Sequence, residues 1–260
     1  MKTILARLAD RLVLRPSTNP IDPEVRQRIL IPFNSGHLEA WSNEVHQETS
    51  SPELIALKFP GTGGRAERAG PHPCELWPEF ASKIWTINPA GYGGSDGQAT
   101  LQTMPAQSDA VFEFVRQELP DHQILLIGNS LGCLSALYLA ARHDVVGVYL
   151  RNPPPLLPLI AERRKYNWWN FGMARFVAEQ IPAELDAITN AARCECPTFF
   201  LRSEKDTVVP EPFQRRIIDA YAGPKQEFVI PEAEHNDFVA EEDFDRYRAE
   251  MDKFKEKWRF

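Results

Sequence analysis

Hydrophobic residues along this chain form two kinds of pattern, and each kind predicts a type of secondary structure. Short runs rich in Ile, Leu, Val and Phe, bounded by turn residues, are typical of β-strands. They predict strands at residues 27–33, 37–45, 54–59, 84–88, 124–127, 145–150, 198–201 and 227–230. Apolar residues that recur three or four positions apart predict helices instead. Such spacing occurs at residues 1–12, 76–82, 105–119, 133–141, 211–221 and 244–258.

The order of these elements predicts an α/β fold. Asn34, Ser35 and Gly36 separate the first two strands and form a hairpin-type turn, which predicts an antiparallel pair. From there on, strands alternate with helices, which is typical of a mostly parallel central β-sheet flanked by helices on both faces. In sheets of this kind, functional residues collect at the carboxyl ends of the strands. Reactive side chains are therefore expected just after predicted strands.

The alternation breaks after the sixth predicted strand. The segment from Leu156 to Pro182 is rich in prolines and aromatic residues and does not continue the strand–helix repeat. We interpret it as part of a small cap, at about residues 155–192, that is inserted into a single domain spanning residues 1–260.

Composition and charge narrow the class of protein. Hydrophobic residues make up 43% and charged residues 25% of the chain, as in soluble globular proteins. The formal net charge of −7 argues against a nucleic-acid partner, because such partners require basic surfaces. No stretch is long and apolar enough for a membrane span, and the N-terminal periodicity is interrupted by charges, unlike a signal peptide. We expect a cytoplasmic protein whose N-terminal amphipathic helix packs on the domain or rests on another surface.

The four cysteines do not indicate a metal site. Cys194 and Cys196 are too close in sequence to act as two pairs of zinc ligands, and no matching histidine pair lies nearby. Cys74 and Cys133 are isolated from them, and reduced thiols are the simplest interpretation of all four. We expect neither a metal nor a cofactor, and the sequence gives no oligomeric state.

Five residues join the strand at 124–127 to the helix at 133–141: Gly128, Asn129, Ser130, Leu131 and Gly132. A serine on a sharp strand-to-helix turn has a strained backbone and an exposed hydroxyl. The flanking glycines let the strand and the helix approach closely, because they lack a Cβ atom. The helix also directs the positive end of its dipole at the turn. We therefore predict that Ser130 is a nucleophile.

Ser130 would need a base and a carboxylate that orients this base, because a serine hydroxyl is a weak nucleophile. Of the six histidines, His235 lies in a loop directly after the last predicted strand, at the edge of the sheet where Ser130 is expected. His72 follows a glycine-rich loop and remains an alternative. Asp206 follows the strand at 198–201 and is the expected carboxylate, with Glu204 as the alternative.

Hydrolysis at Ser130 would also need backbone donors for a negatively charged oxygen. The N–H of Leu131, next to the nucleophile, is one expected donor. The loop at residues 60–64, with the sequence Pro-Gly-Thr-Gly-Gly, is expected to supply the second donor from Thr62, or alternatively from Gly63. A phosphate-binding loop is the other interpretation of these glycines, but the lysine of that motif is missing.

With these motifs the chain resembles serine hydrolases of the α/β-hydrolase fold, of the esterase or thioesterase kind. The resemblance covers most of the chain, from about Ile31 to the C-terminal helix, and rests on residues 60–64, 88–96, 128–132, 206–210 and 234–235. One departure is Pro60, where many members have a histidine. A serine in place of an aspartate nucleophile separates the chain from dehalogenases and epoxide hydrolases.

The resemblance implies that the cap covers the site and that its aromatic residues, among them Trp168, Trp169 and Phe171, line a substrate pocket. The alternative is that they only pack the cap onto the sheet domain. It further implies an enzyme that cleaves a carboxylic ester, or a related acyl bond, of a small-molecule substrate through a Ser-His-Asp triad and an acyl-enzyme. A thioesterase or an acyltransferase would use the same residues. A non-catalytic ligand-binding protein is the alternative from a different class, because fold does not imply function.

Overall fold

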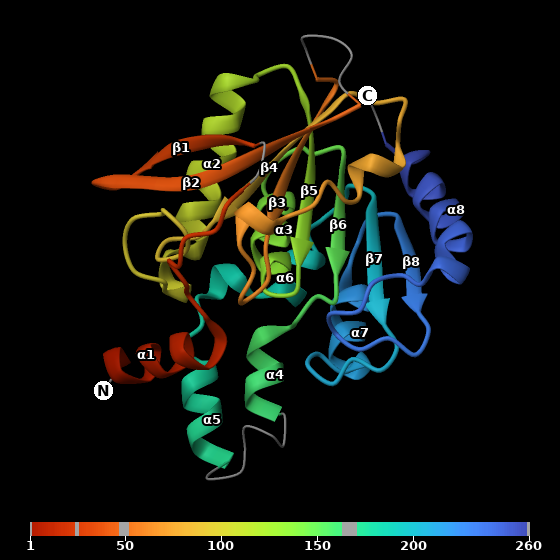
Figure 1. The fold of residues 1–260 in the computed structure, drawn as a ribbon. Helices are drawn as coiled ribbons and strands as arrows, with labels where there is room; N and C mark the ends of the chain where they lie inside the picture. Colours follow the sequence, from red (N-terminus) through yellow and green to blue (C-terminus); the bar gives the residue numbers. More distant parts are fainter. Residues whose placement is uncertain (1, 24–25, 47–51, 163–170, 259–260) are drawn as a thin grey trace.

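The computed structural model of the chain describes residues 2–23, 26–46, 52–162 and 171–258. Its centre is an eight-stranded β-sheet with the order β1-β2-β4-β3-β5-β6-β7-β8 (Figure 1). The strands are β1 (Gln27–Phe33), β2 (Gly36–Val45), β3 (Leu54–Phe59), β4 (Ser82–Asn88), β5 (Gln123–Asn129), β6 (Gly147–Arg151), β7 (Thr198–Ser203) and β8 (Lys225–Ile230).

α-Helices lie before the sheet, in the connections between β4 and β8, and after β8. The α-helices in the described residues are α1 (Lys2–Val13), α2 (Met104–Glu118), α3 (Gly132–Ala140), α4 (Leu156–Glu162), α5 (Phe171–Ala178), α6 (Ala187–Ala191), α7 (Glu211–Ala220) and α8 (Phe244–Lys255). Short 3₁₀ helices lie at Ala66–Arg68, Cys74–Leu76, Leu101–Thr103, Ala183–Leu185 and Glu241–Asp243.

Strand pairing confirms the predicted fold class. β1 and β2 form the antiparallel hairpin, with Asn34 in its turn at a φ of 52°. β2 is also antiparallel to β4, and every neighbouring pair from β4-β3 to β7-β8 is parallel. Parallel strands end at a common edge, so β3 to β8 present their carboxyl ends on one side of the molecule (Figure 1).

Two apolar layers cover the two faces of the sheet, because side chains alternate in direction along each strand. On one face, α2, α3, α6 and α7 pack over strand residues such as Leu57, Leu126 and Phe200. On the other face, α8 buries Tyr247 and Phe254 against alternate residues of the same strands. The apolar stripe predicted near the C-terminus is therefore core packing.

The helix predicted at residues 76–82 is absent. The 3₁₀ helix Cys74–Leu76 ends at Trp77, and β4 begins where the predicted helix would end. Pro78 explains the difference, because a proline disfavours helical backbone at the residue before it and lacks an N–H group. Trp77 is instead fully buried, edge-on to Trp258 with ring centroids 4.7 Å apart. The apolar spacing here reflects burial in the core and not a helix.

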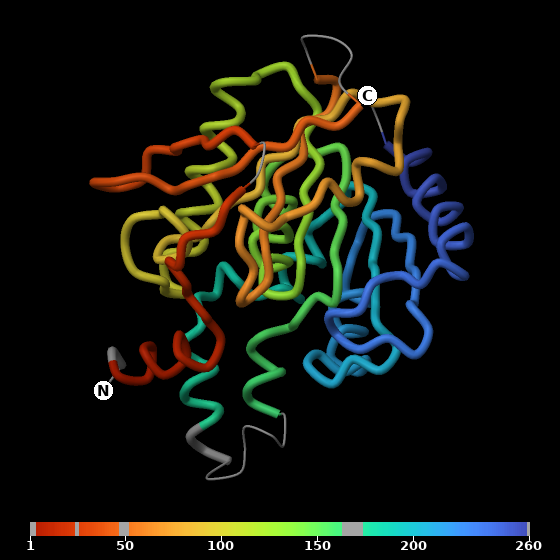
Figure 2. Tube along the Cα trace, in the orientation of Figure 1, coloured from red at the N-terminus to blue at the C-terminus, as the bar shows by residue number. Residues whose placement is uncertain are grey.

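Beyond the carboxyl ends of the parallel strands lie α1, α4 and α5 (Figure 1). α5 packs against both α4 and α1, so the first helix of the chain lies beside the segment that follows β6 (Figure 2). Ala9 and Val13 of α1 are buried in the core, which confirms the predicted N-terminal helix and its packing on the domain. The interval 155–192 contains α4, α5 and α6, and its extent as a cap stays a prediction.

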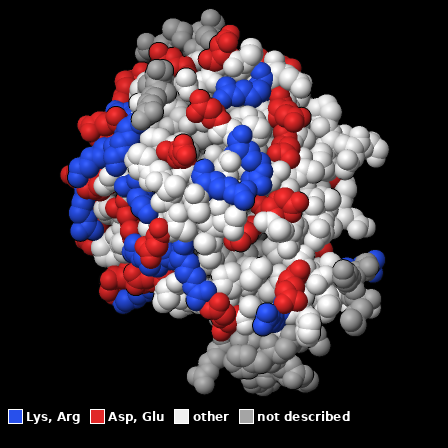
Figure 3. Space-filling view, turned by 180° about the vertical axis from the view of Figure 1, so that it is seen from behind, with Lys and Arg blue, Asp and Glu red and all other residues white. Residues whose placement is uncertain are grey.

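Charged side chains of both signs lie interspersed on the face opposite to the view of Figure 1 (Figure 3). This mixture agrees with a chain that has 29 basic and 36 acidic residues. Among the helices of the described ranges, none combines the length and the apolar character that crossing a bilayer requires.

Replacement of Gly132 by alanine is expected to lower the stability of the protein. A Cβ atom at Gly132 would lie 2.0 Å from the backbone oxygen of Phe59, so β3 or α3 would have to shift. Overpacking of this kind costs about 3 kcal/mol, which corresponds to a fall in Tm of roughly 6–12 °C. Thermal unfolding followed by circular dichroism measures the change. Gly63→Ala is the matched control, because a Cβ atom there meets nothing within 4 Å. An equal fall in Tm for both variants would contradict the expectation.

Candidate active site

Ser130 lies between β5 and α3, at the carboxyl edge of the sheet. Its φ of 49° is in the left-handed region, which a residue with a Cβ atom adopts where the surrounding structure imposes it. Gly128 makes this turn possible, because a Cβ atom there would lie 2.5 Å from Cα of Cys133, and a Cβ atom on Gly132 would lie even closer to β3, at 2.0 Å from the backbone oxygen of Phe59. The N–H of Ser130 donates to the backbone oxygen of Arg151 at 2.8 Å, which ties the turn to the end of β6.

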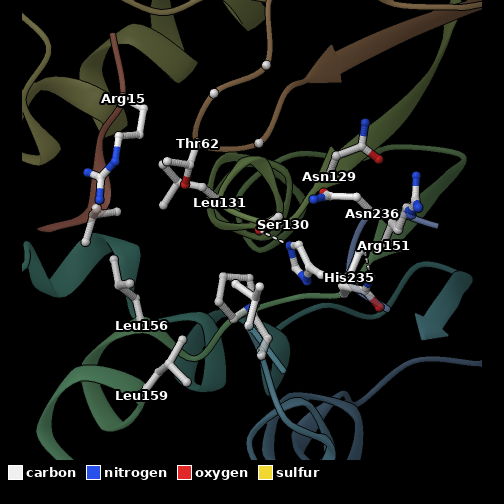
Figure 4. Close-up of a pocket in the computed structure, with 18 of the residues that line it drawn as sticks. Arg15, Thr62, Asn129, Ser130, Leu131, Arg151, Leu156, Leu159, His235 and Asn236 are labelled. Atoms are coloured by element: carbon white, nitrogen blue, oxygen red, sulfur yellow. Dashed lines mark hydrogen bonds between the residues drawn. The ribbon is translucent and has the colours of Figure 1, made fainter. Parts of the chain in front are cut away.

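His235 and Asp206 lie next to Ser130. His235 follows β8, and its Nε2 lies 3.0 Å from the Oγ of Ser130 (Figure 4). Its Nδ1 lies 2.7 Å from the Oδ2 of Asp206, in the loop after β7. The side chain of Asp206 is 0% exposed, whereas Ser130 and His235 line a cavity. A continuous set of contacts therefore leads from a buried carboxylate through an imidazole to an accessible hydroxyl.

Three further donors hold the carboxylate of Asp206. Its Oδ1 accepts the N–H groups of Val208 at 2.8 Å and of Val209 at 2.7 Å. Gln214 on α7 donates its side-chain amide to Oδ2 at 3.1 Å. Because these bonds come from the backbone and from a buried side chain, the carboxylate is already oriented toward His235 before any ligand binds. The contribution of Gln214 has no signal in the sequence, since it depends on how α7 packs.

The two alternatives left open by the sequence lie elsewhere. Glu204 is exposed, and its Oε2 accepts the N–H of Glu232 at 2.8 Å. His72 has its Nδ1 2.9 Å from Oε1 of Glu75 and its Nε2 2.7 Å from the hydroxyl of Tyr247. His72 lines a second cavity and not the one that contains the nucleophile.

Asn152 belongs to the site, and the sequence does not predict it. It follows β6 with a φ of 49° and is 1% exposed. Its Nδ2 donates to the backbone oxygen of His235 at 2.9 Å, and its Oδ1 accepts the N–H of Ser203 at 2.8 Å. The side chain therefore joins the ends of β6 and β7 to the loop that carries the histidine. Two features of the sequence point to this position: it comes directly after a buried strand, and asparagine tolerates left-handed backbone.

The loop after β3 and the turn after β5 bring backbone donors to the same cavity. Thr62 and Leu131 line this cavity together with Ser130. A Cβ atom on Gly61 would lie 3.3 Å from the Cβ of Ser130, so the loop passes close to the nucleophile. Among the described residues, no backbone oxygen accepts the N–H of Leu131, Thr62 or Gly63. These N–H groups are available to an oxygen of a bound molecule.

We call the cavity that contains Ser130 the nucleophile cavity. Its volume is about 650 Å³, and segments far apart in the sequence enclose it. Polar residues lie on one side of Ser130, where Figure 4 shows Asn129, Arg151 and Asn236. The opposite wall is largely apolar, although Arg15 lies on this side too (Figure 4). Its apolar residues are Leu12 and Val13 from α1, Leu156, Leu159 and Ile160 from α4, and Val209.

The aromatic cap residues expected to line the pocket are not placed there by the described structure. Trp168 and Trp169 lie outside the described residues, and Phe171 begins α5 with a side chain that is not described. Their role stays a prediction. In the described part of the chain, α4 and α1 form the apolar wall instead. The sequence predicts α1 as an amphipathic helix but not its partner, because that contact is made with residues far along the chain.

The second cavity has a volume of about 540 Å³ and shares the loop residues Gly61, Gly63 and Gly64 with the nucleophile cavity. Lys58, near the end of β3, lines it and is buried. The Nζ of Lys58 donates to the backbone oxygens of Gly70 and His72, both at 2.8 Å. Burial lowers the pKa of Lys58 to about 8.

The cysteines are free thiols, and Cys74, Cys133 and Cys194 are buried. Burial raises the pKa of the Cys74 thiol to about 12, so it stays protonated at neutral pH and is no nucleophile. Within the described ranges, no group of three His, Cys, Asp or Glu side chains is arranged to hold a metal ion.

Known proteins resemble parts of this chain. A family model described as alpha/beta hydrolase fold matches residues 60–179. An uncharacterized protein of Mycobacterium tuberculosis is 28% identical over 149 residues, which make up 56% of this chain and 50% of that protein. A lysophosphatidylserine lipase of Danio rerio is 25% identical over 196 residues, 68% of this chain and 49% of the lipase. The chain spans about half the length of the curated relatives that it matches.

A solved structure resembles nearly the whole chain. An esterase of Pyrococcus furiosus superposes with a TM-score of 0.65 at 16% sequence identity, over 95% of this chain and 97% of the esterase. At such low identity the likeness concerns the fold alone. The eight-stranded, mostly parallel sheet, the family model that matches residues 60–179 and this superposition together show that the chain has the α/β-hydrolase fold.

Proposed function

We propose that this protein is a serine hydrolase that cleaves a carboxylic ester, or a related acyl bond, of a small-molecule substrate. One observation carries the proposal: Ser130, His235 and Asp206 form a continuous series of contacts of 3.0 Å and 2.7 Å at the edge of a cavity. A serine hydroxyl paired with an imidazole, which is in turn paired with a buried carboxylate, is the arrangement that activates a serine for acyl transfer.

In the first half of the reaction, His235 takes the proton from Oγ of Ser130 while Oγ forms a bond to the carbonyl carbon of the substrate. The carbonyl oxygen becomes negative and accepts the N–H groups of Leu131 and Thr62, with Gly63 as the alternative donor. Asp206 stabilises the imidazolium that forms and keeps its ring oriented. The bond to the leaving group then breaks, and the leaving oxygen takes the proton from His235. The product of this half is an acyl-enzyme on Ser130 and a free alcohol.

In the second half, a water molecule gives a proton to His235 and attacks the acyl carbon. The same backbone donors hold the negative oxygen again. The bond to Oγ of Ser130 breaks, Oγ takes the proton back from His235, and the carboxylic acid leaves. The enzyme returns to its starting state, and the cycle consumes one water molecule for each ester bond cleaved.

The shape of the nucleophile cavity supports an acyl substrate. Its apolar wall of about six side chains suits a hydrocarbon chain, and its volume of about 650 Å³ is in the usual range for small-molecule sites. The protein of Danio rerio that resembles part of this chain is named as a lipase, which favours an ester over an amide. A thioesterase or an acyltransferase would use the same residues.

Two further proposals concern the compartment in which the protein acts and the role of its cap. We place the protein in the cytoplasm, because its cysteines are free thiols, which a reducing compartment maintains. We also propose that residues 155–192 act as a cap over the nucleophile cavity, since α4 in this interval forms part of the cavity wall.

Replacement of Ser130 by alanine is expected to abolish hydrolysis, because no other hydroxyl lies next to His235 in the described site. The rate on p-nitrophenyl esters should fall by about 10⁴-fold or more. A fluorophosphonate probe followed by mass spectrometry should label Ser130 in the wild type and nothing in the variant. Unchanged circular dichroism serves as the folding control. A folded wild type that is neither labelled nor active would favour a ligand-binding protein.

Replacement of Tyr92 by phenylalanine is expected to slow turnover through the oxyanion loop. The hydroxyl of Tyr92 donates to the backbone oxygen of Thr62 at 2.8 Å and accepts the N–H of Arg15 at 2.9 Å. Its loss frees the loop that carries one donor, so kcat should fall by about 10-fold, equivalent to about 1.4 kcal/mol, with KM nearly unchanged. Tyr138→Phe is the matched control, because its hydroxyl bonds to Asp109 outside both cavities. Equal kcat values for the two variants would contradict this role of Tyr92.

A further inference from the structure

The nucleophile cavity and the second cavity share one wall. Five residues line both of them: Gly61, Gly63, Gly64, Asn129 and Arg151. Ser130 and His235 line only the nucleophile cavity. The second cavity therefore begins beside the nucleophile, across the loop that carries the proposed oxyanion donor.

The two cavities differ in chemical character. The wall of the nucleophile cavity formed by α1 and α4 is apolar and suits an acyl chain. The second cavity is lined by four basic side chains, namely Lys58, Arg65, Arg68 and Arg151, against one carboxylate, Glu75. Arg65 is neutralised by an ion pair with Glu67. Oε1 of Glu75 is paired with His72. An excess of positive charge therefore remains in a chain whose net charge is −7.

Arg151 is tied to the reaction centre, because its backbone oxygen accepts the N–H of Ser130 at 2.8 Å, and it lines both cavities. Its guanidinium donates through Nη2 to the backbone oxygen of Asp237 at 2.5 Å and lies over the ring of Phe238, with 5.2 Å to the ring centroid. These contacts fix its direction. Its Nε is buried and donates to no acceptor among the described residues. No ion pair of the described chain includes Arg151.

Several other arginines of the protein have an ion-pair partner, whereas Arg151 has none in the described chain. Arg65 is paired with Glu67, and Arg202 with Glu227. A guanidinium that is held in place, charged and without a carboxylate partner in the described chain is suited to bind an oxyanion, since its planar donors match a carboxylate or a phosphate. Lys58 adds a second positive charge, and its ammonium group donates to two backbone oxygens and carries three protons.

We propose that the second cavity binds the leaving group of the substrate, and that this leaving group carries an oxyanion, a phosphate or a carboxylate, which Arg151 binds. This inference rests on the proposed ester hydrolysis at Ser130 and adds the class of alcohol that the enzyme releases. The acyl chain occupies the nucleophile cavity, the carbonyl lies at Ser130, and the anionic alcohol leaves through the second cavity. Its remaining wall is largely apolar, with Leu201, Val239 and Phe244, so it suits a small leaving group with one charged end.

The test compares three esters that share one acyl chain, the chain hydrolysed fastest among p-nitrophenyl esters. Butyrylglycerol, or its homologue of that chain length, is the neutral substrate. The matching acylglycerol phosphate and acylglycerate carry a phosphate and a carboxylate on the leaving group. We expect the wild type to hydrolyse at least one anionic ester with a kcat/KM about 10- to 100-fold above the neutral ester, through a lower KM. Preference for the phosphate or for the carboxylate identifies which oxyanion the site takes.

The variant Arg151→Gln should lose this preference. The ratio of its kcat/KM on the anionic ester to its kcat/KM on the neutral ester should fall by about 10- to 100-fold relative to the wild type. Arg151→Lys should retain part of the preference, because the charge remains while the planar donors are lost. Glycerol phosphate should inhibit neutral-ester hydrolysis by the wild type and not by Arg151→Gln. Labelling of Ser130 by the fluorophosphonate probe verifies that each variant keeps a folded site.

Two other arginines serve as matched controls. Arg193→Gln removes one charge at the opposite edge of the sheet, outside both cavities, and should leave the preference unchanged. Arg15→Gln removes a charge that lines only the nucleophile cavity. If the anionic preference disappears in Arg15→Gln and persists in Arg151→Gln, the assignment to the second cavity is overturned.

The failure of this inference is distinguishable from failure of the proposed function. Equal kcat/KM for the anionic and neutral esters in a wild type labelled at Ser130 would overturn the inference and leave the hydrolase intact. Absence of both labelling and hydrolysis would overturn the two together. A preference for the neutral ester would show that the second cavity repels anions and would equally overturn the inference.

Discussion

The left-handed backbone of Ser130 is the constraint on which the rest of the site depends. A φ of 49° costs on the order of 1–2 kcal/mol for a residue with a Cβ atom. The packing of α3 against β3 and β5 imposes it, and this packing requires glycine at Gly128 and Gly132. Because Leu131 follows directly, the same turn that exposes the hydroxyl also brings a free backbone N–H to the cavity. Nucleophile and oxyanion donor thus depend on one backbone conformation.

The parallel sheet brings the other residues to that turn. β5, β6, β7 and β8 are neighbours in this order, and each ends at the same edge. Ser130 follows β5, Asn152 follows β6, Asp206 follows β7 and His235 follows β8. Asn152 has the same left-handed backbone as Ser130, with a φ of 49° directly after a strand. Its amide then fixes the histidine loop, so a structural residue just after β6 helps to set the position of the imidazole relative to the nucleophile.

How far the sequence predicts this molecule depends on the range of the interactions. Apolar runs identify the strands, and strand ends together with chain order point to Ser130, Asp206 and His235, which the structure brings into contact. The helix expected at residues 76–82 fails because its apolar spacing reflects burial of Trp77, while Pro78 prevents helical backbone. The position of Asn152 directly after a buried strand is visible in the sequence, but its bond to the histidine loop is not, and the cavity wall from α1 has no local signal. Both depend on contacts between segments about fifty or more residues apart.

The N-terminal helix shows why such distant contacts matter for the chemistry. Leu12 and Val13 form part of the apolar wall next to the nucleophile. Just after the helix, the N–H of Arg15 donates to the hydroxyl of Tyr92, which donates to the backbone oxygen of Thr62. The position of α1 is therefore coupled to the loop that carries a proposed oxyanion donor. A shift of this helix would change the space for the acyl chain and the direction of the donor together, so the fit of an acyl chain against α1 can influence the rate of the step at its carbonyl.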